Sequence, residues 1–169
     1  MKNVFLISCL FSLLAFIGYA QDDSDIIHPG EQMPAFHIVS DDGKIFSSSA
    51  LQGKVVLINF FATWCPPCQK ELADVEARLW PAFQGNKDFS LLVIGREHSD
   101  AELAVYNEKK GFTFPLYPDK DRAIYSKFAN SLIPRCYLIG KDGKVIYTSK
   151  GYTEEGFSEL MEKIEKALK

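Results

Sequence analysis

Cysteine is scarce in this chain: only four of the 169 residues, at positions 9, 65, 68 and 136. So small a number excludes a small domain held together by several structural disulfides. Cys65 and Cys68 have no second pair of the same spacing and no histidine close by in the sequence, so a complete set of zinc ligands is missing too. These cysteines are therefore expected to take part in chemistry.

A large excess of one charge is also missing. The 19 Lys and Arg residues are balanced by 22 Asp and Glu residues, a formal net charge of −3, and basic residues are interleaved with acidic ones throughout. The basic patch that nucleic acid binding requires is therefore absent from the sequence. The expected partners are proteins or small thiols.

The chain has no long hydrophobic run. Its longest apolar stretch, residues 4–17, is shorter than the ~20 residues that a membrane-spanning helix needs. Lys2 precedes the stretch, and the small residues Gly18 and Ala20 follow it, as in a secretory signal peptide. We therefore expect residues 1–20 to be cleaved on export to the periplasm or another extracytoplasmic compartment. Membrane anchoring by an uncleaved N-terminus is the alternative.

The remaining residues suffice for one domain. Hydrophobic residues make up 47% of the sequence, enough to fill one core but not two. Residues 21–33 are polar and acidic without apolar periodicity, so a flexible N-terminal segment is expected there. Residues 34–169 are expected to form the folded domain.

Hydrophobic periodicity and turn residues divide this domain into strands and helices. Strands are predicted at 36–38, 45–46, 54–62, 89–95, 135–139 and 145–149. Helices are predicted at 66–83, 100–110, 121–130 and 157–168. The second of these helices should be capped by Ser99 or Asp100 and end at Gly111. The order predicts an α/β fold with a parallel strand–helix–strand core.

Cys65 and Cys68 lie where the buried strand at 54–62 passes into the following helix. Two intervening residues leave the sulfurs within reach of a disulfide, and the N–H groups and dipole of a helix N-terminus favour the thiolate of the first cysteine. Such settings lower a cysteine pKa from ~8.5 to between ~3.5 and ~7.5. We therefore predict that Cys65 is the nucleophile and Cys68 the resolving thiol. A structural disulfide or half of a zinc site is the alternative.

Three neighbours complete this segment. Pro66 and Pro67 fix φ at the first helical positions, where no helical donor is lost, and so preform the turn around the sulfurs. Trp64 is expected to shield the cysteines and to present a flat apolar surface to a partner.

Residues 56–72, Val-Leu-Ile-Asn-Phe-Phe-Ala-Thr-Trp-Cys-Pro-Pro-Cys-Gln-Lys-Glu-Leu, resemble the active-site segment of TlpA/ResA-like thioredoxin-fold proteins. The resemblance covers most of the chain after the signal, because Ile133-Pro134-Arg135-Cys136 and the turn at 141–144 resemble the family's cis-proline strand and hairpin. It implies a thioredoxin fold: a central mixed β-sheet flanked by helices, with an N-terminal β-hairpin and an inserted helix at 100–110.

The resemblance also implies residue roles. Pro134 should be cis and lie beside the dithiol, with the backbone of Ile133 pairing to an extended segment of the partner. Glu71 matches an acidic residue of the family that tunes a thiol pKa or relays a proton; a solvated acid that stabilises the helix is the alternative. Asn59 stands where thioredoxin has a buried Asp, which leaves Glu71 as the closest proton acceptor.

Two further side chains carry weaker signals. Cys136 is expected to be a small buried core residue, with a third redox thiol as the alternative. His98, which follows the strand at 89–95, is expected to be a solvated loop histidine.

The sequence thus predicts an exported thiol–disulfide oxidoreductase, and by resemblance a protein-disulfide reductase. Disulfide-containing exported proteins and a membrane electron donor are the expected partners; the chain is expected to be a monomer without a cofactor or metal. A peroxiredoxin-type peroxidase is one alternative, although Thr63 lies two rather than three residues before Cys65. A copper-binding thioredoxin-fold carrier is the other alternative. Such carriers have three residues between their two cysteines, whereas only two residues separate Cys65 from Cys68.

Overall fold

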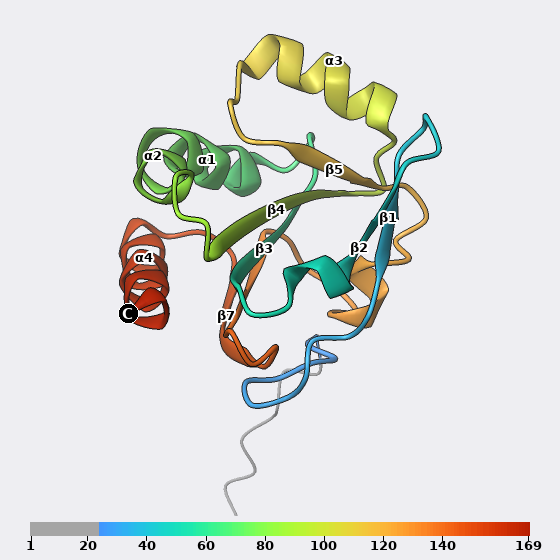
Figure 1. Cartoon of the computed structure of the whole chain (residues 1–169). Helices are drawn as coiled ribbons and strands as arrows, with labels where there is room; N and C mark the ends of the chain where they lie inside the picture. Colours follow the sequence, from blue (N-terminus) through green and yellow to red (C-terminus); the bar gives the residue numbers. More distant parts are fainter. Residues whose placement is uncertain (1–23) are drawn as a thin grey trace, which may run out of the picture.

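The computed structural model describes residues 24–169, so the predicted signal peptide, residues 1–20, lies outside the described residues. Within residues 24–169 one sheet contains five strands: β3 (Val55–Phe61), β4 (Phe89–Arg96), β5 (Leu116–Asp119), β6 (Arg135–Ile139) and β7 (Val145–Lys150). Their order is β5-β4-β3-β6-β7 (Figure 1). The first three run parallel to one another, whereas β6 and β7 are antiparallel to their neighbours. The predicted mixed sheet is confirmed.

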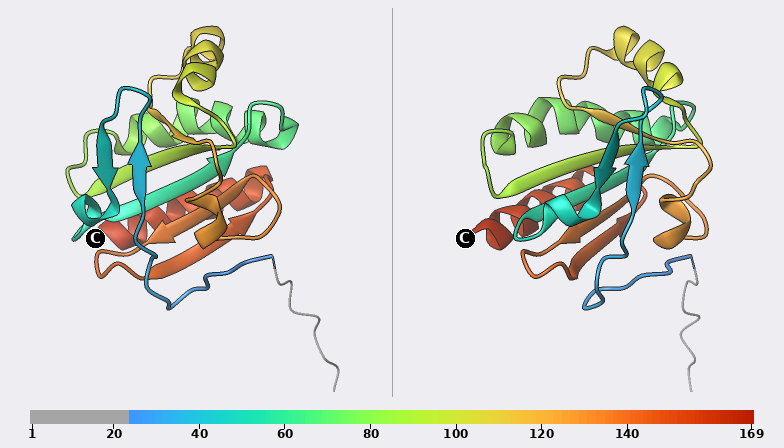
Figure 2. Two further views of the ribbon diagram at one scale, coloured as in Figure 1. Left: turned by 90° about the vertical axis from the view of Figure 1, so that its right-hand side faces the viewer. Right: turned by 45° about the vertical axis from the view of Figure 1, so that its right-hand side comes forward.

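Both faces of this sheet are covered, which is why every residue of β3 is buried. One face packs against α1 (Pro66–Asp74), α3 (Asp100–Lys110) and α4 (Glu154–Leu168). The other packs against the hairpin of β1 (His37–Val39) and β2 (Ile45–Ser47) and against residues 124–129. Figures 1 and 2 show the hairpin and the helices α1 and α4 on opposite sides of the sheet. The hydrophobic core is therefore divided into two layers by the sheet.

The predicted helix at 66–83 is one helical run with an irregular middle. α1 continues into a π-helical stretch, η2 (Val75–Leu79), and then into α2 (Trp80–Phe83). In the π-helical stretch the Trp80 N–H bonds to the Val75 carbonyl, five residues back. The following residue, Pro81, has no N–H and its ring crowds the carbonyl four residues earlier, which widens the helix at this point.

The inserted helix α3 begins and ends as predicted. Ser99 forms a capping box with Glu102, and Gly111 closes the helix in the left-handed region at φ 70°. α3 lies close to the end of β4, since a Cβ on Gly95 would come within 2.7 Å of Leu103 Cδ2. A side chain at position 95 would therefore require Leu103 or its surroundings to shift.

Residues 116–130 differ from the prediction. The short edge strand β5 was not predicted, because its four residues contain Pro118 and show no alternation. The helix predicted at 121–130 is wrong: only the 3₁₀ turn η3 (Tyr125–Lys127) forms. The buried Asp119 carboxylate accepts the N–H groups of Ile124 and Tyr125 at 2.9 and 2.8 Å, and Arg122 has φ 58°. A side chain thus takes the place of the first helical hydrogen bonds.

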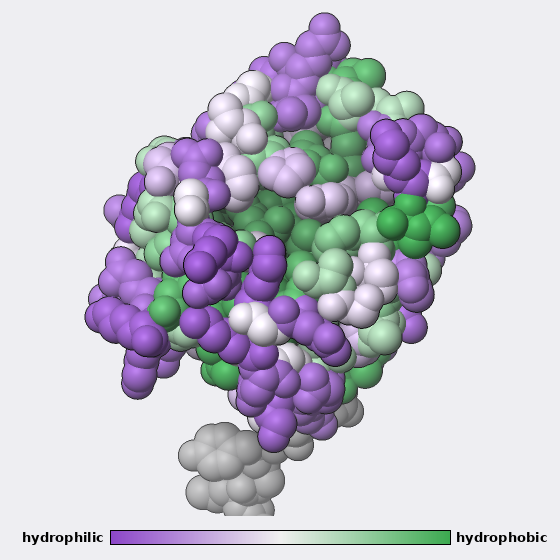
Figure 3. Space-filling view, in the orientation of Figure 1, coloured by the Kyte–Doolittle hydropathy of each residue, from purple (hydrophilic) through white to green (hydrophobic). Residues whose placement is uncertain are grey.

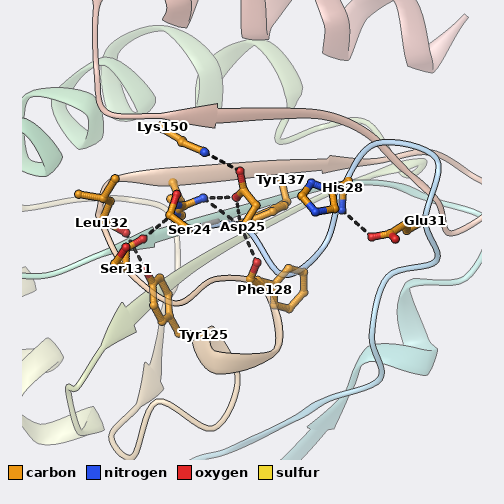
Figure 4. Close-up of polar contacts among 11 residues, drawn as sticks. Ser24, Asp25, His28, Glu31, Tyr125, Phe128, Ser131, Leu132, Tyr137 and Lys150 are labelled. Atoms are coloured by element: carbon orange, nitrogen blue, oxygen red, sulfur yellow. Dashed lines mark hydrogen bonds and ion pairs between the residues drawn. The ribbon is translucent and has the colours of Figure 1, made fainter. Parts of the chain in front are cut away.

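The described part of the N-terminal segment does not behave as a free tether. Asp25 forms ion pairs with Arg135 and Lys150 and accepts a hydrogen bond from the Tyr137 hydroxyl (Figure 4). Ile27 is buried, and the backbone of Gln32 forms a bridge with Lys144. Residues 24–33 of the segment predicted to be flexible, 21–33, thus contact partners that are distant in the sequence.

The surface in the view of Figure 3 is mixed. Hydrophilic residues dominate at the lower left, over α4, and at the top of the view, over part of α3. Hydrophobic residues are seen at the right, on the side of the β1–β2 hairpin. Val39 and Ile45 of the hairpin are among the exposed large hydrophobic residues. Among residues 24–169 there is no helix with the length and apolar character needed to cross a membrane.

Candidate active site

Cys65 and Cys68 form a disulfide at the point where β3 ends and α1 begins. Cys65 is the N-cap of α1, and its sulfur accepts the Cys68 N–H at 3.3 Å. Pro66 and Pro67 occupy the first helical positions, as predicted. The Cys65 sulfur therefore lies against the free N–H groups of the helix, where negative charge on sulfur is stabilised.

The two sulfurs differ in their access to solvent. Cys68 is fully buried, whereas Cys65 retains 4% of its surface and has the exposed residues Trp64, Pro66 and Pro67 beside it. A partner can therefore reach the disulfide at Cys65 and not at Cys68, which is the asymmetry that the assigned order of reaction needs.

The loop before β6 faces this disulfide. The Ile133–Pro134 peptide bond is cis, as the family resemblance implied, and the Ile133 carbonyl oxygen lies 3.9 Å from Cys65 Sγ. Leu132 precedes it with φ 70° and 55% of its surface exposed. Backbone and apolar surface for a bound peptide thus adjoin the reacting sulfur.

Two buried side chains donate hydrogen bonds to the backbone carbonyls of this loop. The Tyr125 hydroxyl donates to the Leu132 carbonyl at 2.6 Å, and Arg135 Nε donates to the Ser131 carbonyl at 2.9 Å. Arg135 is only 1% exposed and is itself paired with Asp25. The N-terminal segment therefore reaches the cis-proline loop through one guanidinium group.

Trp64 is supported by a cation. The guanidinium carbon of Arg96 lies 5.6 Å from the Trp64 ring centroid and 5.2 Å from that of Tyr125. A cation over an aromatic face is attractive. Arg96 therefore holds the exposed Trp64 ring beside the disulfide.

Thr63 is held at both its backbone polar groups. Its N–H donates to His98 Nε2 at 3.0 Å, and its carbonyl accepts from Gln69 Nε2 at 2.7 Å. The prediction of a solvated His98 is therefore wrong. The residue is only 6% exposed, because its ring lies inside the protein and accepts the hydrogen bond from the Thr63 N–H.

Beneath the disulfide, Glu71 belongs to a buried polar cluster with Asn59 and Cys136. Asn59 Nδ2 donates to Glu71 Oε2 at 2.6 Å and lies 3.1 Å from Cys136 Sγ. The Cys136 thiol donates to Glu71 Oε1 at 3.5 Å. The solvated alternative for Glu71 is excluded, and the prediction that Cys136 is buried is confirmed.

Burial dominates the electrostatics of this cluster. Removal from water raises the pKa of Glu71 to about 7, although the hydrogen bonds from Asn59 and Cys136 oppose the shift. Burial, followed by the charge of Glu71, raises the pKa of Cys136 well above its ordinary value. Near neutral pH the carboxyl group therefore exchanges a proton readily, whereas Cys136 stays a thiol.

A cavity of about 260 Å³ between β7 and α4 reaches Glu71. Tyr147, Tyr152 and Phe157 line its walls, and the exposed residues Lys150 and Thr153 lie at its rim. Glu71 is thus connected to the surface through this cavity.

The structure brings the predicted residues around one disulfide: Trp64, Cys65, Pro66, Pro67, Cys68, Glu71, Ile133 and Pro134. The groups that hold them in place were not predicted from the sequence, namely Gln69, Arg96, Tyr125 and Arg135, and the contact of His98 with Thr63 was not predicted either. Of these, only Arg135 had a local signal, since a charged residue inside an otherwise apolar strand requires a buried partner.

Comparisons with known proteins agree with this geometry. Residues 28–164 match the family model described as Redoxin. The chain is 33% identical over 138 residues to thiol-disulfide oxidoreductase ResA of Bacillus cereus, covering 80% of this chain and 78% of the relative. It is 29% identical over 153 residues to ResA of Bacillus subtilis, covering 86% and 83%. A solution structure from Bacteroides thetaiotaomicron, described as a candidate protein disulfide isomerase, is 35% identical with a TM-score of 0.80 and coverages of 86% and 92%.

Proposed function

This chain belongs to the redoxin family and is a thiol–disulfide oxidoreductase, and from that premise we propose that it is exported and reduces disulfides in extracytoplasmic proteins through Cys65 and Cys68. A single observation carries the proposal: a partly accessible cysteine at a helix N-terminus is disulfide-bonded to a buried one beside the cis-proline loop. Trp64, Pro66, Pro67, Ile133 and Pro134 form the proposed surface for the partner.

The first step starts from the reduced enzyme. The Cys65 thiolate attacks one sulfur of the partner's disulfide, a mixed disulfide forms, and the partner's other sulfur leaves as a thiolate that takes up a proton. The Ile133 backbone pairs with the partner's extended segment and aligns its disulfide with Cys65. Since Cys68 is buried, the attack proceeds from Cys65.

The second step releases the partner. Cys68 loses its proton and attacks the Cys65 sulfur, which forms the Cys65–Cys68 disulfide and frees the partner's second cysteine as a thiolate. We assign Glu71 as the acceptor of the Cys68 proton, because it lies one helical turn further along α1 and has its pKa near neutrality. The cavity at Glu71 offers that proton a route to solvent.

A third step restores the dithiol. Two electrons and two protons are needed, and another dithiol supplies them by exchange, becoming a disulfide itself. In an oxidising compartment this donor must draw its electrons from the cytoplasm, so we propose a membrane protein as the donor.

Single cysteine variants test the order of attack. Cys65→Ser should abolish exchange with a disulfide-bonded peptide, whereas Cys68→Ser should form a mixed disulfide that is not resolved, visible as a mass increase equal to one peptide chain. Cys136→Ser is the control and should retain turnover. Full turnover by either Cys65→Ser or Cys68→Ser contradicts the assigned roles.

The reduction potential of the pair tests the direction. Known couples extend from ~−270 mV for thioredoxin to ~−120 mV for a strong oxidant, a difference of ~7 kcal/mol. A value near the thioredoxin end, obtained by equilibration in thiol buffers, supports a reductase. A value near the oxidant end instead makes the protein a disulfide donor.

Export is tested at the N-terminus. Residues 1–20 have the pattern of a signal peptide, so the protein recovered from cells should begin at Gln21 and fractionate outside the cytoplasm. A mature protein that begins at Met1 in the membrane fraction supports the uncleaved anchor instead.

A further inference from the structure

The turn that carries Cys65 is short and is shaped by its backbone. The Cys65 N–H bonds to the Ala62 carbonyl at 3.2 Å, so Thr63 and Trp64 are the two residues enclosed by this turn, which joins the end of β3 to the N-cap of α1. Any shift of Thr63 is therefore passed directly to Trp64 and Cys65. Both backbone polar groups of Thr63 are bound by side chains, the N–H by His98 and the carbonyl by Gln69.

His98 is itself fixed by rigid elements. Its N–H bonds to the Gly95 carbonyl at 3.1 Å, and its own carbonyl accepts the Asp119 N–H at 3.2 Å. Its ring lies 6.4 Å from the ring of Phe61 in β3. The ends of three strands, β3, β4 and β5, thus determine where the imidazole sits.

The contact with Thr63 requires the neutral imidazole. A nitrogen that accepts a hydrogen bond carries no proton, so the proton of His98 is on Nδ1. Nδ1 lies 3.9 Å from Glu102 Oε2 and has no hydrogen-bond partner among residues 24–169. If Nε2 were protonated, it would become a donor facing the Thr63 N–H, which is also a donor. The hydrogen bond between them would then be lost.

The surroundings of His98 favour the neutral form. Burial lowers the pKa of His98, as does Arg96, while Glu102 and Glu97 act in the opposite direction. The Asp119 carboxyl on β5 is occupied by the N–H groups of Ile124 and Tyr125. Two further acids, Asp41 of the β1–β2 turn and Asp100, lie at the N-terminus of α3.

We infer that His98 is a positioning residue for the dithiol: by accepting the Thr63 N–H it holds the turn from which Cys65 attacks the partner's disulfide. The inference rests on the proposed role of Cys65 as the nucleophile. His98 touches neither sulfur and makes no bond to the partner; it acts through the backbone of Thr63. Below its pKa this support is withdrawn, so exchange slows on the acid side by more than the loss of thiolate alone explains.

Two substitutions separate this role from a merely structural one. His98→Gln places an amide oxygen near the position of Nε2, keeps the acceptor and removes the titration. His98→Leu fills a similar space without an acceptor and leaves the Thr63 N–H unpaired. His37→Gln is the matched control, because His37 is exposed on β1.

The experiment measures the rate at which each reduced mature protein reacts with a small aromatic disulfide, from about pH 8 down to a pH below the pKa of His98, which is located by NMR titration of its ring. His98→Leu should react about 10- to 100-fold more slowly, since a misplaced reacting group loses that much. His98→Gln should approach the wild-type rate at neutral pH. The ratio of the wild-type rate to the His98→Gln rate should be constant above the pKa of His98 and fall below it.

Wild type and His98→Gln both contain Cys65 and Glu71. The pH dependence that these two groups give to each rate therefore cancels in the ratio. A ratio independent of pH, or a wild-type rate in His98→Leu, overturns the inference. If His98→Leu does not fold, the pH profile of His98→Gln decides alone. Failure of the proposed function gives a different result: wild type then reacts no faster than Cys65→Ser.

Discussion

At the scale of single residues, the Glu71 carboxyl is the group whose surroundings matter most for the chemistry. It is 3% exposed, and its two oxygens are bonded by Asn59 and Cys136. Asn59 is neutral, so no positive charge among these contacts holds Glu71 ionised. Its pKa of about 7 therefore places the change from proton acceptor to carboxylic acid near neutral pH.

Glu71→Gln tests this residue. At about pH 8 the ionised Glu71 accepts a proton, so its loss should slow resolution of the mixed disulfide about 100-fold, as general bases typically contribute. As pH falls below about 7, Glu71 in the wild type becomes protonated, and the two rates should converge. The measurement is the release of peptide from a preformed mixed disulfide. Glu108→Gln, on the exposed side of α3, should be unaffected; equal rates for wild type and Glu71→Gln at high pH contradict the assignment.

At the scale of elements, α3 contributes more than an extra layer. Its N-terminus begins directly after His98, and Lys110 near its other end donates to Gln69 Oε1 at 3.3 Å. Gln69 in turn donates to the Thr63 carbonyl. The inserted helix thus adjoins both side chains that hold Thr63, and its seat on the sheet depends on the absence of a side chain at Gly95.

Gly95→Ala tests that seat. The added methyl group would meet Leu103 Cδ2 at 2.7 Å and His98 Cβ at 3.2 Å, so the buried Leu103 side chain, α3 or the His98 loop must shift. Overpacking of this kind lowers the free energy of unfolding by about 1–3 kcal/mol. Gly85→Ala is the control, since no atom lies within 4 Å of the added group. Urea denaturation should show a lower free energy of unfolding for Gly95→Ala and no change for Gly85→Ala. If Gly95→Ala is as stable as the wild type, the contact between Gly95 and α3 adjusts without cost.

At the scale of the whole molecule, the N-terminal end of the described chain is tied to the active site through Arg135. Asp25, from the start of the described residues, pairs with Arg135 in β6 and with Lys150 in β7. Arg135 also fixes the Ser131 carbonyl in the cis-proline loop. A segment that the sequence marks as polar and unpatterned thereby becomes part of the support of the partner-binding loop.

Asp25→Asn tests this attachment. The substitution keeps the size of the side chain but leaves the buried charge of Arg135 without its carboxylate, and loss of one partner of a buried pair costs about 3–5 kcal/mol. Asp88→Asn is the control, since Asp88 forms an exposed pair with Lys141 and such pairs contribute little. Denaturation midpoints compare the two. Equal midpoints would show that the Asp25–Arg135 pair does not fasten the segment.

The sequence alone determined the parts of this protein that depend on neighbours along the chain. Two buried strands, the capped helix α3, the hairpins with Asp-Gly turns and the reactive pair at a strand-to-helix junction each arise from a pattern a few residues long. Local patterns fix local backbone geometry, because hydrophobic periodicity and turn residues act over one or two turns. The cis state of Pro134 came from resemblance and not from the residues themselves.

Only the tertiary structure decided how polar groups are satisfied. His98 is buried because Thr63, 35 residues earlier, needs an acceptor, and the N-terminal segment packs against the domain because Asp25 meets Arg135, 110 residues later. In the same way the Asp119 carboxylate, and not a run of helical residues, shapes residues 121–130. A buried donor or charge must find a partner wherever the fold brings one, and no local pattern encodes which distant residue that is.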